Sequence, residues 1–436
     1  MIQAEWAAQN TSPTLRAVAD TLMIRYPEEV DGYYFAGMAA NMLGDYARAV
    51  TPLRRVLSLD SLGARSAVMG RCRRCEAYSG LGHSYGAIDS QVQLAALVHE
   101  WVDRQPDEAQ AWRTLASLYA QQYKRDSALG ALRVADSLEP NNPWNRRYLI
   151  SVTAVLERYP EAEQLIRTEM EAAPFRYGAQ GKWDLAVVLR QMGRLHEALQ
   201  MTQRHRTEVK ERVRRGTAPY DALHEGQVLF ELGRYGAAAA LFDSIARGGA
   251  SSPEPALRAR DQVWAWAHEA DARAELRDTA RLRVLADTME LLGHDLSQAS
   301  YQRLHAHVRG LLARVQGRDA EAANWFRQAI VSPVLGFTRS NYELGAAYLR
   351  LHRPADAIAI LRPATRGGTD GGTLYVTRTE VQARLAEAFD AAGQADSARH
   401  YYGKVLRLWQ RADPEFDSRR EQMRAALARL GGAPVN

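Results

Sequence analysis

Two cysteines, Cys72 and Cys75, stand three positions apart and are the only cysteines among 436 residues. A zinc site needs about four ligands, and neither His83 nor His99 lies at a ligand spacing from this pair. A covalent haem site would require histidine at position 76, which holds Glu76. We therefore expect two structural cysteines. A local disulfide or a redox pair is the alternative, since the two arginines between them could lower a thiol pKa.

The sequence contains none of the familiar catalytic or cofactor-binding motifs. Its eleven histidines are scattered, and His305 and His307 would point to different faces of a helix. The phosphate-binding motif G-x4-G-K-[ST], the nucleophile motif G-x-S-x-G and the zinc-binding motif H-E-x2-H are missing. We therefore expect no enzyme, no cofactor and no metal centre.

Composition and charge are those of a folded protein with a mixed surface. Hydrophobic residues make up 46% and charged residues 25%, and 56 basic against 51 acidic residues give a net charge of +5. Nucleic acid is not expected as a partner, because the balance is nearly even and the basic stretch 204–215 has no aromatic residues between its charges. The sequence shows neither a membrane-spanning run nor a secretory signal in residues 1–10. We expect a cytoplasmic protein without membrane insertion.

The elements that would position any functional residue repeat every 34 residues. Pro106, Pro140 and Pro174 follow one another at that spacing. In residues 109–142, large and small apolar residues recur at spacings of three and four, which places them on one face of each of two helices. Pro140 then ends the second helix. The spacing predicts a series of helical hairpins.

A glycine turn between the two predicted helices recurs five times. Glycine readily takes the left-handed conformation that ends a helix, and an alanine five residues later lets the second helix pack closely. The five turns contain Gly44, Gly193, Gly233, Gly317 and Gly393, and the alanines are Ala49, Ala198, Ala238, Ala322 and Ala398.

This pattern resembles the tetratricopeptide repeat (TPR), whose unit reads W-x2-L-G-x2-Y and continues with A, F, A and P. Residues 109–142 match it with Trp112, Leu115, Tyr119, Ala128 and Pro140. The resemblance covers most of the chain and implies an all-α superhelix, a TPR solenoid of about ten hairpins. The hairpins are predicted at 30–61, 75–108, 109–142, 143–176, 179–215, 219–248, 256–293, 303–336, 338–367 and 379–412, with a partial repeat at 13–27 and a capping helix at 416–430.

Residues 248–253, rich in glycine and serine, are the best candidate for a domain boundary. We place one array at 1–248 and a second, with the capping helix, at 256–436. The first array begins within a repeat, which suggests that an amino-terminal partner domain has been lost or was never present.

In the TPR family, set positions of each first helix line a concave groove in which partner peptides bind. The resemblance places fifteen residues of this chain at such positions: Tyr34, Met38, Asn41, His83, Arg113, Ser117, Trp144, Arg147, Ser151, Trp183, Arg190, His307, Arg314, Arg339 and Tyr342. Arginine pairs with carboxylates through two parallel hydrogen bonds and aromatic rings anchor apolar side chains, so an acidic protein or peptide is the expected partner. The alternative is that these are ordinary helix residues. The clamp that TPR proteins use for chaperone tails needs groove lysines, and none of the four lysines lies at a groove position.

The last third of the chain is similar to the carboxyl-terminal TPR regions of bacterial serine/threonine kinases and DNA-binding activators. The residues that carry this similarity are 327–333, 336–339, 374–380 and 408–414. The resemblance implies a non-catalytic protein-interaction scaffold in a bacterial regulatory system. The alternative is a signal-sensing regulatory domain whose effector domain lies outside this sequence. The oligomeric state is not predicted.

Overall fold

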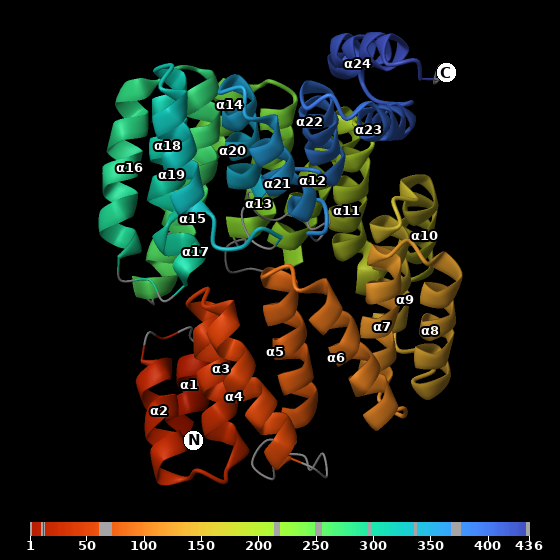
Figure 1. Ribbon diagram of the computed structural model, residues 1–436, viewed down its shortest axis with the longest axis vertical. Coiled ribbons are helices and arrows are strands. Elements are labelled where there is room, and N and C mark those ends of the chain that lie inside the picture. The colour runs from red at the N-terminus through yellow and green to blue at the C-terminus, as the bar shows by residue number, and fades with distance from the viewer. Residues whose placement is uncertain are drawn as a thin grey trace. The chain divides into compact units, whose positions relative to one another are not determined.

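A computed structural model of the chain describes residues 2–9, 12, 14–60, 72–212, 219–248, 255–294, 296, 298–334, 338–367 and 376–432 (Figure 1). Within these ranges the chain consists of helices and the turns that join them, and it contains no strand. The predicted all-α fold class is confirmed.

Most helices pair with the next helix along the chain into a hairpin. The pairs are α1 (Ile2–Gln9) with α2 (Leu15–Arg25), α3 (Val30–Met42) with α4 (Tyr46–Leu59), α5 (Arg73–Ala87) with α6 (Gln91–Arg104), α7 (Ala109–Gln121) with α8 (Arg125–Leu138), α11 (Pro174–Gln191) with α12 (Leu195–Arg212), α13 (Pro219–Glu231) with α14 (Tyr235–Gly248), α15 (Pro255–Glu275) with α16 (Thr279–Gly293), α18 (Leu304–Val315) with α19 (Asp319–Ala329), α20 (Thr338–Arg350) with α21 (Pro354–Ala364), and α22 (Arg378–Ala391) with α23 (Ala395–Leu408). The remaining elements are α9 (Pro143–Val155), α10 (Tyr159–Ala172), α17 (Ala299–Gln302), η2 (Pro414–Phe416) and α24 (Asp417–Arg429).

Helices appear at all the predicted positions, within a few residues of their expected bounds, and α24 is the predicted capping helix. The short elements α1, α17 and η2 were not predicted. Each spans eight residues or fewer, which is too short for a 3.6-residue periodicity to stand out.

The glycine turns have the predicted geometry. Gly44, Gly193, Gly233, Gly317 and Gly393 have φ between +69° and +75°. The alanines five residues later are all fully buried, because the second helix lies directly against the first there. In four other hairpins the same left-handed position holds a residue with a side chain: Asp89 before α6, Tyr123 before α8, Arg277 before α16 and His352 before α21.

Small residues also set the distance between paired helices. A Cβ atom at Gly310 on α18 would lie 2.6 Å from the ring of Phe326 on α19, and one at Gly345 on α20 would lie 2.7 Å from Leu361 on α21. Because real side chains do not approach so closely, the hairpins need glycine at these positions. These contacts, together with the turns, make the hairpins TPR-like.

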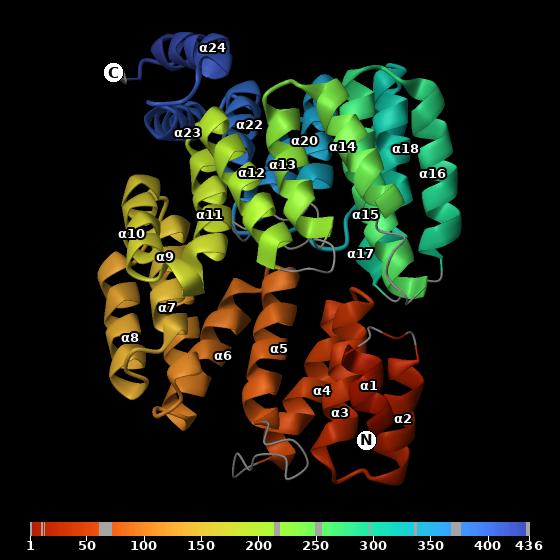
Figure 2. The same ribbon diagram turned by 180° about the vertical axis from the view of Figure 1, so that it is seen from behind.

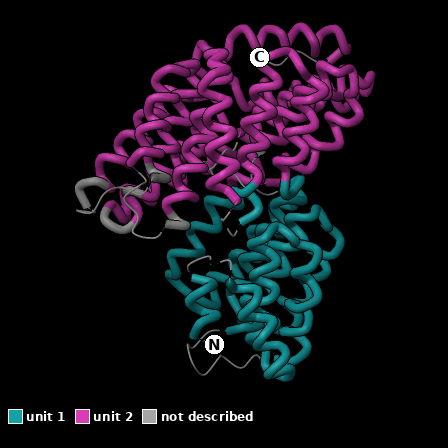
Figure 3. Tube along the Cα trace, turned by 90° about the vertical axis from the view of Figure 1, so that its left-hand side faces the viewer, with its two compact units in different colours: residues 1–152, 295–302, 331–335 teal, residues 153–294, 303–330, 336–436 magenta. Residues whose placement is uncertain are grey.

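The chain divides into two compact units, coloured separately in Figure 3. Unit 1 comprises residues 1–152, 295–302 and 331–335, and unit 2 comprises residues 153–294, 303–330 and 336–436. This differs from the predicted division near residue 248. Residues 249–254 lie outside the described part, but α14 and α15 on either side of them pack closely on each other. A glycine-rich stretch therefore marks a connection here, not a break in the array.

Unit 2 closes on itself. Figure 1 views it from the side of α20–α22, and Figure 2 from the side of α11–α15. The side-chain oxygen of Gln191 on α11 accepts hydrogen bonds from the backbone N–H of Thr379 at 3.2 Å and from its hydroxyl at 3.3 Å. The backbone N–H of Asp413 donates to the carbonyl of Gly193 at 3.0 Å. The first helices α11, α13, α15, α18, α20 and α22 consequently surround a common interior.

Candidate functional site

Eight of the fifteen predicted groove residues line one of two cavities, each contained in one unit. Tyr34, Met38, Asn41 and His83 line a cavity in unit 1, which we call the α3–α5 pocket. Arg190, Arg314, Arg339 and Tyr342 line a cavity in unit 2, which we call the arginine chamber.

The α3–α5 pocket has a volume of about 610 Å³. Tyr34, Met38 and Asn41 stand at spacings of four and three on α3, so one face of that helix forms one wall. The full lining is Tyr34, Met38, Asn41, Met42, Gly44, Tyr46, Leu53, Cys75, Glu76, Ser79, Gly80, His83, Gln298 and Ser300. Methionine, leucine and tyrosine provide an apolar surface, and hydroxyl, amide and imidazole groups provide polar contacts.

Hydrogen bonds and ring contacts hold the walls of this pocket in place. The Asn41 amide donates to the carbonyl of Gly80 at 3.3 Å and accepts from the Ser84 hydroxyl at 2.9 Å. The rings of Tyr46 and His83 meet edge to face, with centroids 5.5 Å apart. The hydrogen bonds join α3 to α5 and the ring contact joins α4 to α5, so the pocket is preformed.

A fully buried arginine lies behind the pocket. Arg73 donates to Asp31 at 2.6 Å, to Glu76 at 2.7 Å and to Glu5, and its guanidinium lies 4.4 Å from the ring centroid of Tyr34. Burial alone would lower the pKa of Arg73, but its hydrogen bonds to the three carboxylates outweigh this effect and the pKa is raised. Arg73 therefore remains charged and ties α1 and α3 to α5.

The two cysteines form a disulfide bond at the start of α5, with their Cα atoms 5.2 Å apart. The expectation of two structural cysteines with free thiols is therefore corrected, and the local disulfide is the alternative that the structure contains. Sequence reasoning could not decide between them, because a C-x2-C spacing at a helix start suits both.

The arginine chamber has a volume of about 410 Å³ and lies among the inner helices of unit 2. Its lining is Arg190, Leu195, Phe230, Glu231, Tyr235, Glu275, Arg314, Arg339, Tyr342, Glu343, Ala346, Arg350, Val376, Thr377, Glu380, Arg384, Glu415, Phe416 and Arg419. Six arginines thus face five glutamates across a small space. The fifteen predicted partner-binding residues include three of these arginines, Arg190, Arg314 and Arg339, and none of the five glutamates.

Ion pairs in the chamber connect neighbouring helices. Arg190 on α11 makes a two-point contact with Glu231 on α13, at 2.9 and 2.6 Å. Arg314 on α18 donates to Glu275 on α15 at 2.7 Å. Such bidentate and charge-assisted contacts are the strong ones among protein hydrogen bonds. The helices that enclose the chamber are therefore bound to one another through its charged lining.

A second group of contacts closes the chamber near α24. Arg419 donates to both carboxylate oxygens of Glu380, each at 2.7 Å, and Arg384 donates to the hydroxyl of Tyr342 at 2.8 Å. Burial would raise the pKa of Glu380, but the charge of Arg419 outweighs it and holds this pKa below the usual range. Burial raises the pKa of the Tyr342 phenol. Glu380 is therefore ionised and Tyr342 neutral near neutral pH.

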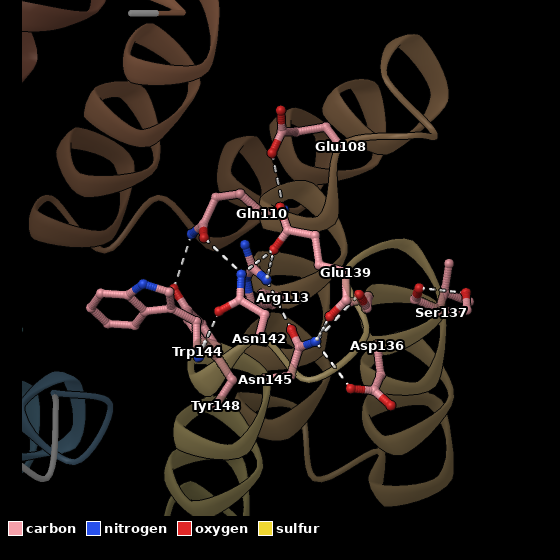
Figure 4. A network of polar contacts seen from close by, with 12 residues as sticks. Glu108, Gln110, Arg113, Asp136, Ser137, Glu139, Asn142, Trp144, Asn145 and Tyr148 are labelled. Carbon is pink, nitrogen blue, oxygen red and sulfur yellow. Dashed lines mark hydrogen bonds and ion pairs between the residues drawn. The ribbon is translucent and has the colours of Figure 1, made fainter. Parts of the chain in front are cut away.

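Two predicted groove residues that line neither cavity are buried and make internal contacts. Arg113 is 5% exposed and donates to Glu139 and Asn145, both at 2.8 Å, within the network of Figure 4. His307 is fully buried between Asp271, at 3.1 Å from its Nε2, and the hydroxyl of Ser340, at 3.0 Å from its Nδ1. Their prediction as partner-binding residues is corrected, because the neighbouring repeat covers the face that carries them.

The other five predicted residues lie away from both cavities. Trp144 is 53% exposed, Arg147 lies over its ring at 5.4 Å, and Ser151 is exposed as well. Ser117 is half-buried and donates to the backbone of its own helix. Trp183 is half-buried, with the rings of His205 and His224 at 5.5 and 4.4 Å. The structure does not bring these residues together with the two cavities.

Two clusters have the composition of a chemical site. Asp271, His307 and Ser340 follow the order of a catalytic triad, but His307 and Ser340 are fully buried, so no substrate reaches them in this structure. His196, Asp413 and Glu415 bring one ring nitrogen and two carboxylates within 4.8 Å of one another, a set that could hold a metal ion. In the structure His196 donates from its backbone N–H to Asp413 at 2.8 Å, as part of the closure of unit 2.

None of the helices in the described ranges is both long enough and apolar enough to cross a membrane.

Comparisons with known proteins add little to this geometry. No protein-family model matches the chain, and no curated protein matches it. A solved structure titled as the functional characterization of Pseudomonas aeruginosa PilF is 17% identical, with a TM-score of 0.32, and the match covers 50% of this chain and 91% of that one. The fold is TPR-like. That statement rests on the hairpins, turns and close helix contacts described above.

Proposed function

We propose that this chain is a non-catalytic interaction scaffold that holds a segment of a partner protein in the α3–α5 pocket. One observation carries the proposal. Tyr34, Met38, Asn41 and His83 were selected by repeat register alone, and all four line the same cavity. First helices of TPR-like hairpins supply the walls, which is the side on which the family binds its partners.

The lining favours a partner segment with an apolar anchor. Met38, Met42 and Leu53 form an adaptable apolar surface of the kind used for varied side chains. Asn41 and Ser79 stand at the same pocket and could bond to the backbone of the segment. Glu76 also lines it, so an acidic anchor is disfavoured there. The acidic partner expected from the sequence depended partly on Arg113 and Arg190, which are buried in ion pairs.

The regulatory setting is also a proposal. It rests on the similarity of the last third of the chain to TPR regions of bacterial kinases and DNA-binding activators. The sensing alternative is favoured by a separate observation, the enclosed arginine chamber of unit 2.

Selection of peptides from a displayed library on the full chain tests the scaffold proposal. Peptides with an apolar anchor should be enriched, and Met38→Glu should weaken their binding at least about tenfold, since it places a charge where an apolar side chain would lie. Val92→Glu is the matched control, because Val92 lies on α6, is 79% exposed and is not part of the pocket lining. Equal binding by the two variants would contradict the proposal.

A further inference from the structure

Two oppositely charged side chains in the arginine chamber have no hydrogen bond within the described part of the chain. Arg339 is 9% exposed, and the nearest carboxylate oxygen, of Asp271, lies 3.7 Å from its Nε. Glu343 is 7% exposed, and its nearest cation is Arg314, with Nε at 3.7 Å. Both distances are too long for a hydrogen bond. A buried charge without hydrogen bonds is unfavourable unless a further group supplies them.

The other charges of the chamber show the contrast. Arg190 is bound by Glu231, and Arg419 by Glu380, each through two hydrogen bonds. Arg384 donates to Tyr342 at 2.8 Å and to Glu387 at 2.7 Å. Among the described residues, Arg314 and Arg384 each leave Nε without a hydrogen-bond partner but donate from their other nitrogen atoms. Arg339 and Glu343 differ from them in making no side-chain hydrogen bond at all in this part of the chain.

Arg339 and Glu343 lie four positions apart on α20 and line the same cavity. Residues at this spacing are neighbours on a helix face, with Cβ atoms about 5–6 Å apart. They form no ion pair with each other, and the guanidinium of Arg339 is instead placed over the ring of Phe230, 4.8 Å from its centroid. A molecule with adjacent opposite charges could bridge the two.

We propose that the arginine chamber binds a small zwitterion with the chemistry of a free amino acid. Its carboxylate pairs with the guanidinium of Arg339 through parallel hydrogen bonds, and its ammonium group pairs with the carboxylate of Glu343. The rings of Phe230, Tyr235 and Tyr342, which line the same space, contact the remainder of the molecule.

Size and enclosure favour a small molecule over a peptide strand. The volume of about 410 Å³ falls in the range of small-molecule sites. The contacts of Gln191 with Thr379 and of Gly193 with Asp413 join the two ends of unit 2, so the chamber is not a groove open along its side.

The charges of the lining favour a zwitterion over a multiply charged anion. A phosphate dianion would suit Arg339 but would also meet the unsatisfied carboxylate of Glu343, whereas a zwitterion brings a positive group for it. The proposed amino-acid site lies in unit 2 alone, so its test does not depend on whether the α3–α5 pocket binds a partner segment.

Isothermal titration calorimetry of the full chain with each standard amino acid at millimolar concentration tests the proposal. We expect saturable binding of at least one of them. Arg339→Gln and Glu343→Gln should each weaken it about 10- to 100-fold, as expected for loss of a charged hydrogen-bond partner. Arg353→Gln is the matched control, because Arg353 is exposed, bound to Asp356 at 2.7 Å and not part of the chamber lining. The affinity of this control variant for the amino acid should change by less than about threefold.

Analogues of the best amino acid that lack one charge separate the two contacts. The analogue without the amino group should bind more weakly, respond to Arg339→Gln and be insensitive to Glu343→Gln. Circular dichroism checks that each variant is folded. If Arg339→Gln does not fold, Arg339→Lys, which keeps the charge but loses the planar pair of donors, takes its place. The proposal would be overturned if no amino acid binds, or if both variants bind with unchanged affinity. Singly charged analogues that bind as tightly as the amino acid itself would overturn it as well.

Discussion

His307 Nε2 lies 3.1 Å from Asp271 Oδ1, and both residues are almost completely buried between α15 and α18. Burial would raise the pKa of Asp271, but the charge and hydrogen bond of His307 outweigh it and the pKa is lowered. The second oxygen of Asp271 lies 3.7 Å from Nε of Arg339. Asp271 therefore joins α15 to α18 through His307 and also lies near Arg339, the arginine of the chamber that has no hydrogen bond within the described ranges.

Replacing His307 with leucine should destabilise the chain. The substitution removes the hydrogen bonds to Asp271 and Ser340 and leaves both groups buried without that partner. We expect the free energy of unfolding to fall by about 1–3 kcal/mol. Urea denaturation followed by circular dichroism measures it, with His305→Leu on the same helix, at a half-buried position, as the control. A loss no greater than that of the control would mean that the contact contributes little.

Stability should decrease below about pH 6.5 because two buried histidines are held neutral. Burial lowers the pKa of His268 to about 3, and burial with the charge of Arg190 lowers that of His224 well below its ordinary value of 6.5. In the unfolded chain both imidazoles take up a proton as the pH falls through 6.5, whereas in the folded chain they do not. Acid therefore favours the unfolded state, by up to about 1.4 kcal/mol per pH unit for each histidine.

Urea midpoints measured between neutral pH and about pH 4 test this assignment. His268→Leu should lose stability less steeply than the native chain over that range, because one proton-binding site of the unfolded state is gone. Parallel pH profiles for the two proteins would show that His268 is protonated in the folded state. His196→Leu, at an exposed position, serves as the control.

The sequence predicted the hairpins well because each is determined by local features. The left-handed turn at Gly317 and the close contact at Ala322 both lie within a few residues of the helices they define. The closure of unit 2 was not predictable in this way, since Gln191 and Thr379 are 188 residues apart and no periodicity relates them.

The candidate sites were predicted only in part, for a related reason. Repeat register identifies the inner face of a helix, and Arg339 and Tyr342, which it placed on that face, both line the arginine chamber. Register alone does not reveal what the next repeat places against that face. Arg113 is covered by Asn145 on α9, and Glu343 gained its importance only from the lack of a hydrogen-bond partner in the folded chain.

Removing the buried arginine of α7 should destabilise the chain far more than removing the exposed arginine of α9. Arg113→Ala would leave Glu139 and Asn145 without a shared donor inside the network of Figure 4, so we expect a loss of about 2–4 kcal/mol in the free energy of unfolding. Arg147→Ala, at an exposed position over Trp144, should change it by about 0.5 kcal/mol or less. Similar losses in both variants, measured by urea denaturation, would show that Arg113 is not part of a stabilising network.

The left-handed turns permit a reciprocal test of the repeat itself. His352 occupies the position with φ of +55° between α20 and α21 that glycine holds in other hairpins. A residue with a Cβ atom is destabilised by roughly 1–2 kcal/mol in this conformation, whereas glycine costs up to about 1 kcal/mol because it makes the unfolded chain more flexible. His352→Gly should therefore stabilise the chain by up to about 1 kcal/mol. Gly317→Ala places a Cβ atom at a position with φ of +75°. No atom of the described residues lies within 4 Å of the new Cβ, so the loss of stability comes from backbone conformation alone and should be about 1 kcal/mol or more. The Tm and the urea midpoint should therefore rise for His352→Gly and fall for Gly317→Ala. Shifts in the same direction would mean that the backbone conformation at these turns does not limit stability.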